Sequence, residues 1–177
     1  MAGDGDKAGI VAEAVVISPV GRMIPDEHTA RFWRDQVDMS MEESRVWLRL
    51  TQRGSAREIL RRDWLREDPV LHTMLVLKQA ASTNFPLSED EAQCLEQMWA
   101  CVGQDWPRSE SIAGLWAYTA TIGKPVSRLA GSPVSTVSHL TGRAVPGIYN
   151  KVMNFRSIAP RDERAGMSGA GAIDREV

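Results

Sequence analysis

Signals that start and stop helices recur along this chain, and they constrain its fold more than any other feature. Asp68 before Pro69 pairs an N-cap carboxylate with proline at the first helical position, and Ser132 repeats the arrangement with its own proline. Ser88 with Glu91 three residues later forms a capping-box pattern. Apolar residues at helical spacing follow these starts, and glycines follow several of the expected ends. The pattern predicts helices over residues 69–82, 88–103 and 109–122.

The first half of the chain gives a mixed pattern. Residues 10–17 are an apolar, largely β-branched run, which favours a short strand or an extended arm, although no second strand is evident to pair with it. Helices are predicted from Pro25, from Ser40 to Gly54, and from Ser55 through Trp64. We therefore expect an all-α fold, a compact multi-helix bundle with a short N-terminal strand or arm.

Four regions follow from this pattern. We expect an N-terminal arm over 1–24, a helical domain over 25–107, a helix-turn-helix-like DNA-binding region over 108–160 and a mobile tail over 161–177, where Gly, Ala, Ser and charged residues dominate. Hydrophobic residues make up 43% of the chain and charged residues 25%, a balance typical of a folded globule. The chain lacks an apolar stretch long enough to span a bilayer, and its start is acidic, so we expect a cytoplasmic protein with no membrane partner.

Residues 132–158 have the layout of a helix-turn-helix. A short helix begins after Ser132, Gly142 supplies a left-handed turn, and a second helix opens near Pro146 with an apolar inner stripe. Amide and basic side chains are expected on its outer face, where Asn pairs with adenine and Lys or Arg with guanine or phosphate. The candidate DNA-binding residues are Ser135, Thr136, Arg143, Asn150, Lys151, Asn154 and Arg156.

The charge distribution supports a nucleic-acid partner. Residues 111–161 contain six basic residues and no acidic residue. Clearing carboxylates from so long a segment of a near-neutral protein predicts a positive face, and such a face usually meets phosphate. The alternatives are a chance of composition or a patch for an acidic protein partner.

The residues that common enzyme sites require are missing. The three histidines stand apart from one another, and no zinc, serine-hydrolase, P-loop or dinucleotide-binding motif occurs. Cys94 and Cys101 are expected to be reduced core residues. We expect no catalytic residues, no metal and no cofactor, and the remaining enzymatic alternative is a site assembled from dispersed residues.

Two resemblances point the same way. Residues 128–138 are similar to the helix-turn-helix of LacI-type repressors. A longer similarity resembles the non-catalytic DNA-recognition domain that precedes the nuclease in McrA-like HNH restriction endonucleases. It is carried by Leu115-Trp116-Ala117-Tyr118, Gly142-Arg143-Ala144-Val145, residues 149–156, Pro160-Arg161-Asp162 and Ala165-Gly166-Met167-Ser168. The resemblance implies DNA recognition in a bacterial restriction or defence system, and the chain lacks the His-Asn-His site of the nuclease itself.

The sequence thus predicts a non-catalytic bacterial protein that binds double-stranded DNA, as a regulator or as the targeting component of a restriction or defence system. Its N-terminal helices are expected to support the motif, or to hold a homodimer or a partner protein. The alternative is a helical interaction subunit of a larger protein or protein–nucleic acid complex. That alternative rests on Arg45, Arg49, Arg53 and Arg57, which recur every four residues.

Overall fold

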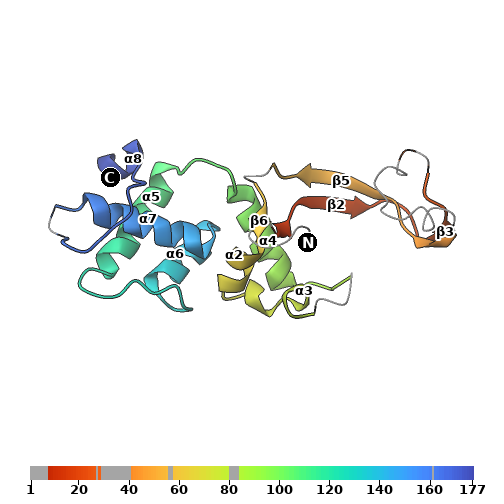
Figure 1. Ribbon diagram of the computed structural model, residues 1–177, viewed down its shortest axis with the longest axis horizontal. Coiled ribbons are helices and arrows are strands. Elements are labelled where there is room, and N and C mark those ends of the chain that lie inside the picture. The colour runs from red at the N-terminus through yellow and green to blue at the C-terminus, as the bar shows by residue number, and fades with distance from the viewer. Residues whose placement is uncertain (1–7, 27, 29–40, 56–57, 80–83, 161) are drawn as a thin grey trace. The chain divides into compact units, whose positions relative to one another are not determined.

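The chain folds into two compact units, of which the second is inserted into the sequence of the first. The structure is a computed structural model and describes residues 8–26, 28, 41–55, 58–79, 84–160 and 162–177. Unit 1 comprises residues 1–11 and 55–177, and unit 2 comprises residues 12–54. The described residues form seven α-helices and six strands in three small antiparallel sheets (Figure 1). The fold is therefore mixed α/β, and the all-α prediction is wrong.

The described residues of unit 2 form two short antiparallel ribbons. Strand β2 (Ala12–Val16) pairs with β5 (Leu48–Arg53), and β3 (Gly21–Met23) pairs with β4 (Glu43–Arg45). The β2–β5 register shifts between Glu13 and Ala14. The apolar run at residues 10–17 thus contains strand β2, and its partner lies in a segment for which the sequence predicts a helix.

The helix predicted from Ser40 to Gly54 is wrong because a strand pattern overlaps a helical one there. Leu48 and Leu50 alternate with Arg49 and polar residues, which is the period of two that a strand requires. Within so short a segment, apolar residues also fall at helical spacing, so periodicity alone does not decide. Pairing with β2 decides in favour of the strand. The helix predicted from Pro25 lies mostly outside the described residues.

One face of the β2–β5 ribbon is apolar and uncovered. Ala14 lies opposite Leu50 and Val16 opposite Leu48, which brings these four side chains to one face. Val16 and Leu48 are each 57% exposed and Leu50 is 62% exposed. Glu13, which alternates with them, accepts a hydrogen bond from the Thr51 hydroxyl at 2.9 Å. The ribbon is therefore amphipathic.

The first part of unit 1 surrounds a core of leucine, methionine and tryptophan side chains. Strand β1 (Gly9–Ile10) pairs with β6 (Leu60–Arg61), and helix α2 (Arg62–Glu67) follows. The helix predicted from Ser55 through Trp64 is therefore wrong over residues 58–61, where the chain forms a bend and strand β6, and helix begins only at Arg62. A short 3₁₀ helix, η3 (Leu71–Thr73), leads to α3 (Leu75–Lys78) and α4 (Glu89–Cys101). The core of this part comprises Leu60, Leu65, Leu71, Met74, Met98 and Trp99.

Both predicted helix caps of this region are present, but only one of them begins a continuous helix. The capping box of Ser88 and Glu91 is present at the start of α4 and confirms that prediction. Asp68 Oδ1 accepts the amide hydrogens of Val70 at 2.9 Å and Leu71 at 3.0 Å, as an N-cap carboxylate does. The helix that follows is not continuous, because Met74 has an extended backbone between η3 and α3.

The second part of unit 1 contains the two helices predicted within residues 132–158. Helices α5 (Arg108–Ala120), α6 (Pro133–Thr141) and α7 (Val145–Ile158) pack on one another, and α8 (Ala172–Glu176) contacts α5 and α7. Ser132 Oγ caps α6, and Gly142 ends it with a φ of 70°, as predicted. The apolar residues that α5, α6 and α7 bury together are Ala117, Tyr118, Val134, Val137, Val145, Ile148, Val152 and Phe155.

Candidate nucleic-acid interface

Helices α6 and α7 are joined by the short turn 142–144, but α7 is deeply packed. Five of its residues, including Lys151, are buried. Helix α7 contacts α2, α5, α6 and α8, so its outer face is narrower than the sequence predicts. The hydrogen-bond partners of each basic side chain on and near α7 therefore decide whether that side chain can contact a ligand.

Arg143 is occupied inside unit 1. Its Nε donates to Glu110 Oε2 at 2.7 Å, and Nη1 donates to the carbonyl oxygens of Cys101 and Gln104 at 2.8 Å each. Nη2 donates to the Asp105 carbonyl at 2.7 Å, and the side chain is 10% exposed. The guanidinium thus binds backbone carbonyls at and after the end of α4. The sequence predicts instead that Arg143 contacts DNA.

Lys151 is also held inside unit 1, by an ion pair with Asp174. Its Nζ lies 2.7 Å from Asp174 Oδ1 in α8, and the two side chains are 7% and 1% exposed. A Cβ at Gly114 in α5 would come within 2.6 Å of the Lys151 Cγ, so glycine makes room for the lysine. Lys151 Nζ and the Arg143 guanidinium both lie over the Trp106 ring, at 4.3 Å and 4.8 Å.

The segment after α7 packs back onto the helices, although the sequence predicts a mobile tail there. The Met167 amide donates to the Met153 carbonyl at 3.0 Å. Asp162 accepts hydrogen bonds from Arg164 Nε at 2.7 Å and from the Tyr118 hydroxyl at 3.0 Å. These hydrogen bonds, the one from Arg164 above all, hold the pKa of the Asp162 carboxyl well below its usual range.

The other predicted site residues are not gathered into one patch. Ser135 is buried, whereas Thr136 is exposed with its hydroxyl donating to the Ser132 carbonyl at 3.0 Å. Asn150 is exposed on α7, and the Asn154 amide one turn later packs against Gly169. Arg156 is half-buried, and its Nε and Nη2 have no hydrogen-bond partner among the described residues.

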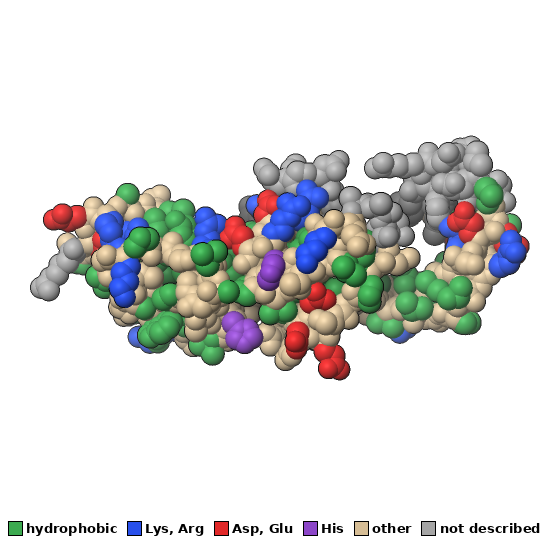
Figure 2. Space-filling model, turned by 90° about the horizontal axis from the view of Figure 1, so that it is seen from below, with side chains coloured by type: hydrophobic (Ala, Val, Ile, Leu, Met, Phe, Trp, Pro, Cys, Tyr) green, Lys and Arg blue, Asp and Glu red, His purple; other side chains and the backbone are tan. Residues whose placement is uncertain are grey.

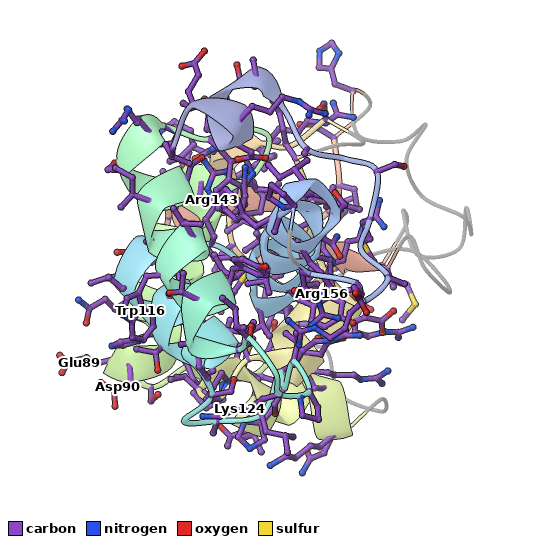
Figure 3. The ribbon with its side chains drawn as sticks, turned by 90° about the vertical axis from the view of Figure 1, so that its left-hand side faces the viewer. Glu89, Asp90, Trp116, Lys124, Arg143 and Arg156 are labelled. Atoms are coloured by element: carbon purple, nitrogen blue, oxygen red, sulfur yellow. The ribbon has the colours of Figure 1, made fainter. Side chains whose placement is uncertain are left out.

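Basic residues in the loop between α5 and α6 were not singled out as site residues from the sequence. Lys124 is exposed, and its carbonyl accepts a hydrogen bond from Arg164 Nη1 at 2.9 Å. Arg128 lies 4.4 Å from the centre of the Tyr149 ring and pairs with Glu67 at 2.9 Å. In the view of Figure 3, Arg143 lies above and Lys124 below, with Arg156 between them. Both loop residues belong to the segment 111–161 without acidic residues, and that charge pattern was the feature of the sequence that could have identified them.

Lys and Arg side chains are visible over the part of unit 1 that contains α5 to α8. Figure 2 shows them at the end of the molecule where Figure 1 labels these helices. Some of these charges are neutralised, because Arg128 pairs with Glu67 and Arg164 with Asp162. Lys124 and Arg156 have no ion pair with a described residue.

The environment of Cys94 and the arrangement of possible metal ligands bear on whether the chain holds a catalytic site. Burial, with a smaller contribution from Asp68, raises the pKa of the Cys94 thiol to about 12, which is the opposite of an activated nucleophile. Among the described residues, no group of three or more His, Cys, Asp or Glu side chains is arranged to hold a metal ion. No described helix is both long and apolar enough to cross a membrane.

Comparison of this chain with family models, with curated proteins and with solved structures finds no match. The resemblance to the McrA-like domain therefore stays a prediction.

Proposed function

We propose that unit 1 binds double-stranded DNA through its α5–α7 helices, without catalysis. The observation that carries this proposal is the absence of acidic residues from 111 to 161, a segment that includes most of α5 and the whole of α6 and α7. The charges of Arg143 and Lys151 are neutralised by Glu110 and Asp174, so the remaining basic side chains of the segment set its surface charge.

Lys124 and Arg156 are the residues we assign to phosphate contacts. Lys124 is exposed in a loop and forms no ion pair with a described residue. Nε and Nη2 of Arg156 are buried without a hydrogen-bond partner among the described residues, so turning the side chain outward to a phosphate would break no hydrogen bond of these two atoms. Arg143 and Lys151 are left out of the contact set, since releasing either would leave the carboxylate of Glu110 or of Asp174, which are 19% and 1% exposed, without its partner.

Thr136 and Asn150 are the exposed polar residues that we assign to the DNA grooves and backbone. A hydroxyl contacts phosphate oxygens, and a side-chain amide reads the edge of adenine. Such a protein would act in the bacterial cytoplasm as a regulator or as the targeting component of a restriction or defence system, the role that the resemblance to McrA-like enzymes implies.

The proposal is tested by fluorescence anisotropy with a random-sequence DNA duplex over a range of salt concentrations. The variant combines Lys124→Ala with Arg156→Gln. Wild-type binding is expected to weaken steeply with salt, and losing two phosphate contacts should reduce the slope of log K against log salt by about two units.

The matched control combines Lys78→Ala with Arg66→Gln, which removes two exposed positive charges outside the acid-free segment. This control should keep the wild-type slope. The proposal is overturned when the wild-type chain shows no binding at about 50 mM salt, where non-specific affinity is strongest, or when both double variants lower the slope equally.

A further inference from the structure

A cavity of about 320 Å³ lies between the residues that begin η3, helix α4 and helix α6. Its size is at the lower end of the range for small-molecule sites. Polar side chains from these elements line it, together with the apolar residues Pro69, Val70, Met98 and Ala130. The polar groups of the lining are Asp68, Cys94, Gln97, Ser135, Thr136, Ser138, His139 and Arg143.

Asp68 brings an incompletely satisfied carboxylate to this cavity. The residue is 6% exposed. Its Oδ1 accepts the amide hydrogens of Val70 and Leu71, and the Cys94 thiol at 3.7 Å, whereas Oδ2 accepts no hydrogen bond from a described residue. Although the residue as a whole is buried, Oδ2 itself is not a buried atom, so it can accept a hydrogen bond from a ligand group that donates one.

Ser135 brings an unused hydroxyl. The residue is also 6% exposed. Its backbone amide donates to Ser132 Oγ at 3.2 Å, but its hydroxyl has no hydrogen-bond partner among the described residues. The hydroxyl oxygen is accessible, and Ser135 lines the same cavity as Asp68, so this hydroxyl is a second group that can bind a ligand.

The charge balance of the cavity selects the sign of the ligand. Arg143 is the only strongly basic side chain in its lining, and it is already bound to Glu110 and to three backbone carbonyls. Cys94 stays a neutral thiol at physiological pH. The Asp68 carboxylate is therefore left to attract a cation, and an anionic ligand would be repelled.

We propose that this cavity binds a small primary amine in its ammonium form. The ammonium group donates hydrogen bonds to Asp68 Oδ2 and to Ser135 Oγ, and a short alkyl chain lies against Val70 and Met98. An ammonium group has three donors and no acceptor, which matches two acceptors that lack donors. One lining residue, Thr136, is also assigned to the DNA backbone, but the amine contacts are made by Asp68 and Ser135, so this site does not rest on the proposed function.

The test is a titration of the full-length chain with n-butylamine hydrochloride at pH 7, followed by two-dimensional amide NMR. The amides of Val70 and Leu71 report on the Asp68 carboxylate, because they donate to its Oδ1, and the Ser135 amide reports on α6. We expect these three signals to shift and to saturate, with a dissociation constant in roughly the millimolar range for so small a ligand. Butan-1-ol, which has the same shape without the charge, and butyrate should not shift them.

The decisive variant is Ser135→Ala, which removes a hydroxyl that the folded chain leaves unpartnered, so the variant should fold. Ser109→Ala, at an exposed serine of α5 outside the cavity lining, is its matched control. Ser135→Ala should weaken butylamine binding at least about threefold, and the control should bind as wild type does. Asp68→Asn, which keeps an acceptor oxygen but loses the charge, should abolish the selective shifts. Equal shifts with butan-1-ol, unchanged binding by Ser135→Ala, or no saturable shift at all would each overturn the proposal.

Discussion

Replacing Arg143 with alanine should destabilise the protein far more than replacing an exposed arginine. The side chain makes four hydrogen bonds, one to the Glu110 carboxylate and three to backbone carbonyls between Cys101 and Asp105. It also lies over Trp106. Alanine leaves Glu110 without its partner and leaves three carbonyls to find other donors.

The size of the effect follows from those contacts. Hydrogen bonds to a charged group each contribute about 1.5–3 kcal/mol, but those of one side chain do not add independently. Breaking a buried ion pair by removing one member costs about 3–5 kcal/mol. Since the Arg143 and Glu110 side chains are 10% and 19% exposed, we expect a loss of about 3–4 kcal/mol in the free energy of unfolding.

The assay is urea denaturation followed by tryptophan fluorescence and by circular dichroism. Arg128→Ala is the matched control, because Arg128 pairs with Glu67 at the surface, where the side chains are 44% and 34% exposed. That pair should contribute no more than about 1 kcal/mol. A loss below about 1 kcal/mol for Arg143→Ala would refute the reasoning and return Arg143 to the set of free basic residues.

Three further measurements test other parts of the structure. Gly142→Ala should destabilise more than Gly123→Ala in thermal melts. Both glycines have a positive φ, but only at Gly142 would a Cβ meet a neighbour, the Gln97 carbonyl at 3.1 Å. Equal losses would contradict this close contact. Because the pKa of Asp162 is lowered in the folded state, its contribution to stability should be complete above the ordinary carboxyl pKa of about 4 and should decline as the pH falls. Asp162→Asn should remove that part of the pH dependence, and an unchanged acid profile would contradict it. Iodoacetamide at pH 8 should label Cys94 slowly in the native state and rapidly in urea, since its thiol has a pKa of about 12, and rapid native labelling seen by mass spectrometry would contradict the assignment.

Helix caps were the most informative part of the sequence. Ser88, Ser132 and Gly142 each act as predicted because a cap depends on a few adjacent residues and their backbone. The two helices of the predicted helix-turn-helix follow from the same local signals. Local interactions of this kind can be predicted from the sequence because the residues that make them are close neighbours along the chain.

Strand pairing and the partners of charged side chains could not be predicted in this way. Strand β2 pairs with residues more than thirty positions later, and nothing in its own sequence identifies them. Lys151 has the outward position of a DNA contact on a helical projection, yet Asp174 and the space left by Gly114 turn it inward. Both outcomes depend on tertiary contacts, which override local pattern.

The antiparallel pairing of β1 with β6 has a consequence for how this chain can be divided. Ile10 lies opposite Leu60, so the points where the chain leaves and re-enters unit 1 are neighbours in a ladder. A segment whose two ends are held side by side is exchangeable, as inserted domains generally are. Unit 2 can thus be described as a domain inserted into the loop of the β1–β6 hairpin. Joining β1 to β6 through a tight turn would restore that hairpin and leave the hydrogen bonds of unit 1 intact.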